Sequence, residues 1–456
     1  MVLGQMFERF AAESAISVMT RGVMQHALAA SAVDQVFEDT AHWQYTRELL
    51  FSTLVDLVSV VVCSARPSMH AAYQAARERI PVSLTAVYDK LNHVEPGVSA
   101  ALVRHTALRL APVIEAMGGA LPALLPGYRV KIVDGNHLAA TERRVKVLRA
   151  SKAGPLPGFG VVVLDPRLML AIDIVPCEDG HAQERSLTPA LLATVVAHDL
   201  ILADRNFCTS RLLSGIVGHG AFFAIRQHAT NLAWEPRGAR QRCGRRDGAT
   251  IYEQPIDARD ADGNPMSLRR VTIVFDAPIR NGETELHVVT NLPVADAGAV
   301  GVAALYRQRW TVETMFHDLQ RTLNGEIKTL GYPPAALFCF CVALASYNVL
   351  STVKAALRGT HGHAKIEDEV SEYYIADEIR GTYRGMMIAL PPPEWTGFES
   401  LGSDALAEQL RAWAGQVKLA RFRRHARGPK KPVPPRTRYT MHTHVSTARL
   451  LAEYRA

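Results

Sequence analysis

Two short apolar segments of the sequence each run into an aspartate, and this feature narrows the folds that the chain can adopt. Residues 128–134 alternate in polarity and lead into Asp134-Gly135, whereas residues 200–204 are apolar up to Asp204. Short segments of this kind, closed by an acid or a glycine, are typical of β-strands that run into turns. A buried sheet with acids at the ends of its strands can bring the two carboxylates close to one point.

A third acid, Glu313, lies in a segment whose apolar residues recur at helical spacing. At 100° per residue, one stripe of this helix is apolar and holds Leu305, Val312, Phe316, Leu319 and Leu323. A second stripe, roughly 70° around the helix, carries Tyr306, Arg309, Glu313 and Gln320. The first stripe can pack in a core while the second presents a carboxylate between an arginine and a phenol. The alternative is an exposed flank on which Arg309 and Glu313 form an ion pair worth a few tenths of a kcal/mol.

Three carboxylates around one point would suit two Mg²⁺ (or Mn²⁺) ions. Hard divalent cations prefer oxygen ligands, and two ions about 4 Å apart can bind the attacking and leaving oxygens of a displacement at phosphorus. Either aspartate alone is more typical of a residue that closes a turn or caps a helix. The prediction therefore depends on the three acids together. His137 and His317 lie near them in sequence, and we interpret both as neighbours of the site or surface residues.

The 456 residues divide by pattern into five regions. We expect an α/β protein with a mixed sheet flanked by helices, including one continuous helix over residues 300–323 and another helix over residues 188–197. Residues 1–125 are a helical N-terminal part that we expect to bind DNA ends. Residues 126–226 and 297–358 are the first and second parts of the core, and residues 227–296 are a β-rich insertion between them. Residues 359–456 are a C-terminal part with a basic tail.

Charge weakly favours a polyanionic partner such as DNA, since the net charge is +7 and the pI is near 9.1. Two basic runs could neutralise phosphates: one in the insertion with Arg237, Arg240, Arg242, Arg245 and Arg246, and one over residues 418–438 that includes Lys430 and Lys431. A solvated loop and a disordered tail are the alternatives. The six cysteines lack zinc-ligand spacing and fit a reducing cytoplasm. The apolar runs 54–63 and 336–350 are shorter than the roughly 20 residues that span a bilayer, so we expect core helices and no membrane.

The segment around Glu313 resembles the signature of DDE transposases from bacterial insertion sequences, in the branch marked Tyr-x2-Arg-x3-Glu-x6-Lys. Tyr306, Arg309 and Glu313 match this pattern, whereas Gln320 stands where the pattern has lysine. Residues 133–135 resemble the first acidic strand of the family, and residues 202–205 resemble the second. The resemblance covers roughly residues 128–350.

This resemblance implies a ribonuclease-H-like core in which Asp134, Asp204 and Glu313 bind the two metal ions. Tyr306, Arg309 and the residue at position 320 would contact DNA phosphate. The implied endonuclease reaction is hydrolysis that frees a 3′-OH at the transposon end, followed by attack of that hydroxyl on target DNA. The implied assembly is a homodimer in a synaptic complex, in the bacterial cytoplasm and associated with the nucleoid when bound.

Three other functions stay open at the level of sequence. Glutamine can donate and accept hydrogen bonds but lacks the charge of lysine, so Gln320 permits a catalytically impaired DNA-binding protein of the same fold. A metal-dependent nuclease that only hydrolyses DNA is the second alternative. A glycosidase that uses a carboxylate pair is the third, but it would leave the arginine-rich segments unexplained.

Overall fold

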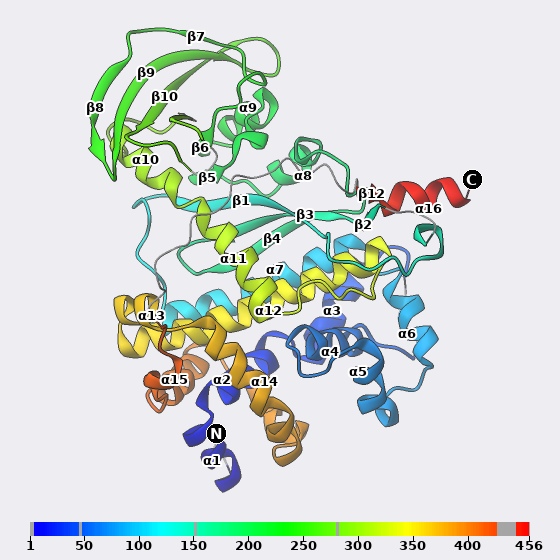
Figure 1. Ribbon diagram of the computed structural model, residues 1–456. Coiled ribbons are helices and arrows are strands. Elements are labelled where there is room, and N and C mark those ends of the chain that lie inside the picture. The colour runs from blue at the N-terminus through cyan, green and yellow to red at the C-terminus, as the bar shows by residue number, and fades with distance from the viewer. Residues whose placement is uncertain (1–3, 45–47, 150–152, 280–281, 426–443, 456) are drawn as a thin grey trace.

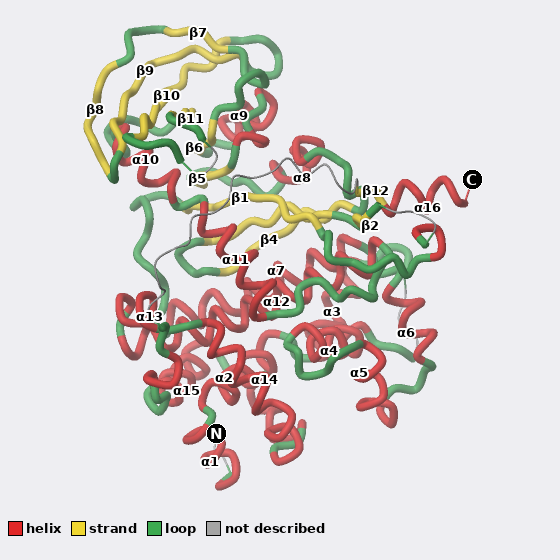
Figure 2. The backbone as a smooth tube through the Cα atoms, viewed as in Figure 1, coloured by secondary structure: helices red, strands yellow, loops and turns green. Residues whose placement is uncertain are grey.

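A mixed sheet lies between a β-rich lobe and a large helical layer (Figure 1). The computed structural model describes residues 4–44, 48–149, 153–279, 282–425 and 444–455. Coloured by secondary structure, the strands occupy the upper part of the molecule and helices fill the lower part (Figure 2). The chain is thus an α/β protein, as its sequence pattern predicts.

Five strands form the part of the sheet that carries the two aspartates: β1 (Arg129–His137), β3 (Phe159–Asp165), β4 (Leu170–Cys177), β5 (Asp199–Ala203) and β6 (Phe222–Arg226). Their order is β4-β3-β1-β5-β6. Strand β3 is antiparallel to both β4 and β1, whereas β5 runs parallel to β1 and β6 runs parallel to β5. An antiparallel meander followed by two parallel strands beside its first strand is the ribonuclease-H-like arrangement. The predicted fold class is therefore confirmed.

Both faces of this sheet are covered, which explains why β5 is buried throughout. Successive side chains of a strand point to opposite faces, so Ile132 and Val133 of β1 belong to two different hydrophobic clusters. The first cluster includes residues of the long helices α7 (Pro96–Ala116) and α12 (Pro333–His361). The second includes residues of α9 (Ser210–Gly218). The acids thus follow strands that the core holds from two sides.

The β-rich region continues the same sheet. Strand β11 (Glu285–Thr290) pairs with β6, β10 (Pro265–Phe275) pairs with β11, and β9 (Ala249–Arg259) pairs with β10. Strands β7 (Trp234–Pro236) and β8 (Gln241–Arg246) both pair with β9, which completes a 10-stranded sheet. Backbone hydrogen bonds between β6 and β11 therefore join the predicted insertion to the core. The domain boundaries stay predictions.

The helix predicted over residues 300–323 is broken into two. Helix α10 (Ala299–Arg307) ends at its C-cap Gln308, and α11 (Trp310–Thr322) begins after Arg309. Gln308 and Arg309 keep right-handed helical dihedral angles, so the chain bends here without reversing. The prediction of one continuous helix was wrong at this point. The helix predicted over residues 188–197 is also shorter, since α8 spans Thr188–Leu192.

The remaining helices surround α7 and α12 on the side away from the sheet (Figure 1). From the N-terminal part they are α1 (Gln5–Glu13), α2 (Ala15–Ala27), α3 (Ala30–Thr40), α4 (Phe51–Val62), α5 (Met69–Ala76) and α6 (Leu84–Leu91). From the C-terminal part they are α13 (His363–Glu369), α14 (Glu372–Ala389) and α15 (Ser403–Ala414). The last described segment forms β12 (His444–Ser446), which pairs with β2 (Gly154–Leu156), and α16 (Thr447–Arg455).

Helix α12 is long and apolar enough to cross a membrane by length and composition alone, with a mean hydropathy of 1.8 over its most apolar window. However, 94% of that window is buried inside the protein. This burial agrees with the prediction of a core helix, because a helix that is apolar on all sides must be covered on all sides.

A buried side chain of α12 fixes the helix to the sheet. The Oδ1 atom of Asn348 accepts a hydrogen bond from the backbone N of Ala171 at 2.8 Å, and its Nδ2 donates to the Ala171 carbonyl at 2.9 Å. Nδ2 also donates to Thr106 Oγ1 of α7 at 3.2 Å. Ala171 lies in β4, the edge strand of the sheet. Asn348 therefore satisfies backbone groups that have no strand beside them on that edge.

Replacing Asn348 with leucine should lower the free energy of unfolding by about 2–4 kcal/mol, because both backbone groups of Ala171 would stay buried without partners. Urea denaturation followed by circular dichroism measures this loss. As a control, Gln74→Ala changes an exposed polar residue of α5 and should stay within about 0.5 kcal/mol of the parent. A leucine variant as stable as the parent would show that Asn348 is not the anchor we describe.

Candidate catalytic site

Asp134 and Asp204 lie side by side because β1 and β5 are parallel neighbours. Val133 is opposite Ala203 in the register. The next residue after each of them, Asp134 or Asp204, therefore lies at the same level of the sheet. Asp204 directly follows β5 and caps a short 3₁₀ turn, where its Oδ1 accepts from Asn206 N at 2.7 Å. The sequence pattern predicts that Asp134 ends its strand. This prediction was wrong, since β1 continues to His137.

Arg309 joins Glu313 to Asp134. Its Nη1 lies 3.3 Å from Asp134 Oδ2, and its Nη2 donates to Glu313 Oε1 at 2.5 Å. The arginine is only 9% exposed, whereas the Glu313 side chain is 43% exposed. The guanidinium of Arg309 therefore lies between the carboxylates of Glu313 and Asp134. The i,i+4 ion pair that the sequence left as an alternative is present, but its arginine is buried and bridges to the sheet.

Tyr306 and Gln320 have different surroundings. Tyr306 is buried, and burial raises the pKa of its phenol to about 12, although the positive charge of Arg309 acts to lower it. The phenol is thus protonated at neutral pH and can donate a hydrogen bond. Gln320 is exposed on α11, about 10 Å along the helix axis from Glu313 at 1.5 Å per residue. His317 and His137 are also exposed, and the ring of His137 lies 5.1 Å from the ring of Phe159 between centroids.

A fourth carboxylate, Glu184, lies against the first aspartate and was missed by sequence reasoning. It comes from a 3₁₀ turn (Glu184–Leu187), and a Cβ atom at position 135 would lie 2.3 Å from its Oε1. Only glycine at position 135 leaves room for this approach. Oε2 of Glu184 is buried and has no hydrogen-bond partner in the described part of the chain. Gly135 was the only signal in the sequence, and it was read as a turn residue.

We call Asp134, Asp204 and Glu184 the acid cluster. Burial raises the pKa of Asp134 to about 7, and the negative charges of Asp204 and Glu184 raise it further against the positive charge of Arg309. Burial and the charge of Asp204 also raise the pKa of Glu184. Negative charge is therefore crowded at this point, and one arginine does not offset it.

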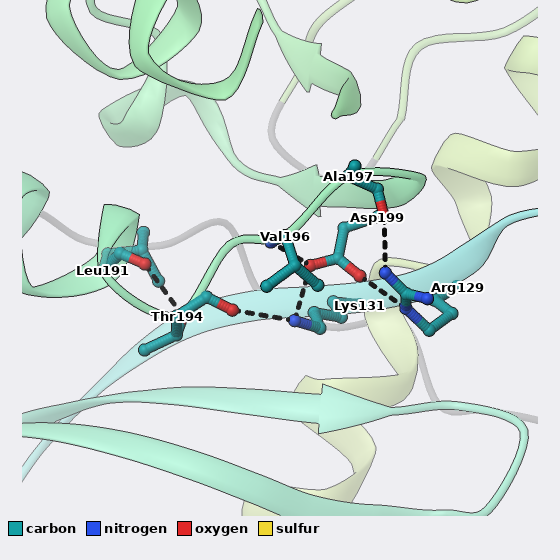
Figure 3. A network of polar contacts seen from close by, with 7 residues as sticks. All are labelled: Arg129, Lys131, Leu191, Thr194, Val196, Ala197 and Asp199. Carbon is teal, nitrogen blue, oxygen red and sulfur yellow. Dashed lines mark hydrogen bonds and ion pairs between the residues drawn. The ribbon is translucent and has the colours of Figure 1, made fainter. Parts of the chain in front are cut away.

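The acid cluster differs from the acid at the opposite end of β5. Asp199 is fully buried and forms ion pairs with Arg129 Nε at 3.0 Å and with Lys131 Nζ at 2.7 Å (Figure 3). It also accepts a hydrogen bond from the backbone N of Val196 at 2.8 Å. Lys131 donates further to the Thr194 carbonyl. Asp199 is thus a structural acid with its partners in place, whereas the acid cluster has an excess of negative charge.

The donor chemistry of the acid cluster fits hard divalent cations, which prefer carboxylate oxygens, and the buried, unpartnered Oε2 of Glu184 supports this fit. Within the described residues, however, no three His, Cys, Asp or Glu side chains are close enough together to hold one metal ion. The guanidinium of Arg309 lies between Asp134 and Glu313 instead. The arrangement can bind a cation at Asp134, and in this structure the cation is an arginine.

The arginines of the predicted basic run lie on β8 (Arg242, Arg245 and Arg246) and in the segment between β7 and β8 (Arg237 and Arg240). Arg245 pairs with Asp276 at 2.6 Å, Arg246 lies 3.5 Å from Asp247, and Arg237 lies 3.9 Å from Asp257. Arg240 stacks over Tyr252, and Arg242 is exposed. Trp234, at the start of this region, lies under Arg270. None of these contacts reaches the acid cluster. Lys430 and Lys431 lie outside the described residues.

Part of the chain matches a family of known proteins. Residues 125–348 match the family model described as the transposase DDE domain. The matched residues begin just before β1, include the acid cluster and Glu313, and end inside α12. No curated protein matches the chain. Among solved structures, the chain is similar to the piggyBac transposase in a synaptic complex with hairpin DNA, at 10% identity and a TM-score of 0.40 over 88% of this chain and 84% of that one.

The two kinds of acid should respond differently to an isosteric amide when stability is measured in EDTA. Asp199→Asn should cost about 3 kcal/mol, because it leaves the partly buried Lys131 without a counter-ion. Asp134→Asn should stay within about 1 kcal/mol of the parent or exceed it, because it removes repulsion from Asp204 and Glu184. Chemical denaturation checks both. A loss at Asp134 as large as the loss at Asp199 would contradict the charge crowding.

Proposed function

We propose that the chain is a DNA transposase that hydrolyses a phosphodiester bond at each transposon end and joins the freed 3′-OH to target DNA, with two divalent metal ions. One observation carries this proposal. Asp134 and Asp204 stand at neighbouring positions of two parallel strands inside the matched DDE domain, with Glu313 one guanidinium away. The resemblance of Tyr306, Arg309 and Glu313 to the insertion-sequence signature supports the same reaction and favours that branch.

In this proposal Asp134, Asp204 and Glu313 hold Mg²⁺ or Mn²⁺. Glu184 stands beside the first two and supplies a further carboxylate. The ions, when bound, would activate the attacking oxygen and neutralise charge on the scissile phosphate. Each carboxylate binds and orients, and none needs to form a covalent bond. The excess negative charge of the acid cluster favours cation binding, since it is the charge that Arg309 alone does not balance.

Arg309 and Tyr306 are the residues that we assign to DNA phosphate. A guanidinium can bind a phosphate through two parallel hydrogen bonds, and the protonated phenol of Tyr306 can donate one more. Both side chains are buried beside the acid cluster. With Asp134 engaged as a metal ligand, Arg309 would be free to bind an anion. Gln320 would contribute a hydrogen bond without charge.

Binding of the rest of the DNA is also proposed. The exposed arginines of the insertion, Arg237, Arg240, Arg242, Arg245 and Arg246, can neutralise backbone phosphates, as can Lys430 and Lys431. The helices of residues 1–125 would recognise the transposon ends. Two ends must be held together for transposition, and we propose a homodimer for this. All six cysteines are free thiols, which is consistent with the proposed location in a reducing cytoplasm.

The leading alternative is a DNA-binding protein of the same fold with impaired catalysis. Gln320 in place of lysine favours it, as does the Arg309 bridge between Asp134 and Glu313. Metal-dependent nicking of DNA that contains the element's ends separates the two functions. A hydrolysis-only nuclease is a further alternative, and strand transfer from a pre-cut end would exclude it.

Asp134→Asn, Asp204→Asn and Glu313→Gln should each abolish cleavage, because each removes a charged metal ligand. Glu184→Gln should reduce cleavage and Mn²⁺ affinity by about 10-fold to 100-fold, as expected for a residue beside the ligands. Gel assays with Mg²⁺ measure cleavage, and calorimetry measures Mn²⁺ binding.

DNA affinity should change little in all four variants when it is measured in EDTA. Glu408→Gln is the control, since Glu408 is exposed on α15, far along the chain from the DDE domain. Near-parental cleavage by any variant of the first three would disprove the assignment of that ligand.

Gln320→Lys should strengthen DNA binding and raise the cleavage rate by up to about 10-fold at low salt, because it adds a point charge that attracts phosphate. The gain should shrink as salt increases. Thr314→Lys places the same charge at another exposed position of α11 and serves as the matched control. Equal gains from both variants would show a general effect of charge rather than a role for position 320.

A further inference from the structure

A cavity of about 640 Å³ lies among helices of the N-terminal and C-terminal parts. These helices lie on the side of α7 and α12 away from the sheet (Figure 1). Its walls come from α2, α4 and α5 in the N-terminal part and from α14 in the C-terminal part. Most of its lining is apolar, for example Leu57, Val60, Ile80 and Met387. The volume falls in the range of sites for small molecules. None of the lining residues belongs to the matched DDE domain.

One carboxylate points into this apolar cavity. Asp56 is the only charged residue of α4, whose other residues are mostly buried. Asp56 lies deep among helices, but solvent can reach it because it lines the cavity. Within the described residues Asp56 has no hydrogen bond or ion pair. Burial raises its pKa, which the charges of Arg21 and Arg79 act to lower.

Four arginines also line the cavity: Arg21, Arg66, Arg79 and Arg384. Among the residues that the structure describes, none of the four lies in an ion pair. Arg21 bonds to Gln25, but its Nε is buried without a partner. Four positive charges against one negative charge leave the lining with a net positive charge. Arg21 and Arg66 are half-buried, whereas Arg79 and Arg384 are exposed at the cavity. A half-buried cation without a partner costs free energy that an anionic ligand can recover.

We propose that this cavity binds an amphipathic organic anion, a molecule with one carboxylate, sulfonate or phosphate group on an apolar body. The apolar body would fill the space along Leu57, Val60 and Ile80, and the anionic group would lie among the arginines. Asp56 would oppose the anion, and its neighbours Arg21 and Arg79 reduce this effect. Arginine suits the anionic group because its planar fork matches carboxylate and phosphate.

Duplex DNA fits this cavity less well than a small anion. A phosphate backbone is bound by polar and charged surfaces, and it could not cover the apolar walls. A bound molecule would instead bridge α4 and α5 to α14, which packs against α11. The cavity therefore offers a binding site separate from the acid cluster, and its test does not depend on transposase activity.

Titration of the full chain with 8-anilinonaphthalene-1-sulfonate, followed by fluorescence, tests the proposal. Arg79→Gln should weaken binding by about 10-fold, as expected for loss of a charged hydrogen bond, and Ala76→Phe should weaken it by filling the cavity. Asp56→Asn should strengthen binding, since it removes the opposing charge. Decanoate and hexyl phosphate should displace the dye, and their relative strength identifies the preferred anionic group.

Decyltrimethylammonium has a similar apolar chain with the opposite charge and should not displace the dye. Arg211→Gln changes an exposed arginine of α9 and should leave the affinity unchanged, while thermal melting confirms that each variant folds. Unchanged affinity in Arg79→Gln and Ala76→Phe would overturn the proposal. Displacement by the cation, or by duplex DNA in a manner that depends on Arg79, would overturn it as well.

Discussion

The parallel pairing of β1 with β5 is the contact on which the candidate site depends. Parallel neighbours in register bring residues that follow Val133 and Ala203 to the same level of the sheet, and both residues are aspartates. The pairing is held by the cores on the two faces of the sheet, because β5 is buried throughout and α7 and α12 cover one face. At the other end of the same two strands, Asp199 of β5 forms ion pairs with Arg129 and Lys131 of β1. The core thus fixes the acids and leaves them little freedom to separate.

Charge crowding at the acid cluster is the cost of this placement. A carboxylate whose partners satisfy it, such as Asp199, contributes to stability. The acid cluster instead holds two aspartates and Glu184, with one buried arginine against Asp134. Burial raises the pKa of Asp134 most, and the charges of Asp204 and Glu184 add to this effect against the charge of Arg309. Perturbed groups of this kind concentrate at functional sites. Arg309 is an internal counter-ion that holds Asp134 and Glu313 together.

Sequence reasoning succeeded where a residue's role follows from local pattern. The strands before Asp134 and Asp204 have short, apolar patterns that predict an α/β protein. The resemblance of these segments and of the Glu313 segment to DDE transposases implied the ribonuclease-H-like fold that the structure shows. It failed where the outcome depends on tertiary contacts. The bend at Gln308 and Arg309 has no glycine or proline to announce it, and Arg309 is buried there against Asp134 of β1. Glu184 comes from a polar loop, and only folding brings it over Gly135. The pairing of β11 with β6 is equally non-local.

The position of Glu313 depends on α11 as a whole, and α11 is anchored at both ends. Near its start, Arg309 bonds to β1. Near its end, Asp318 faces Glu372 of α14, and burial together with the charge of Glu372 raises the pKa of Asp318 to about 8. Lys354 of α12 bonds to Glu372 at 2.7 Å and favours its ionised form. Asp318 is therefore the protonated member at neutral pH and can donate to Glu372. The helix that presents Glu313 is thus tied to the sheet by the guanidinium of Arg309 and to α14 by the hydrogen bond between Asp318 and Glu372. Both contacts help to position the third acid.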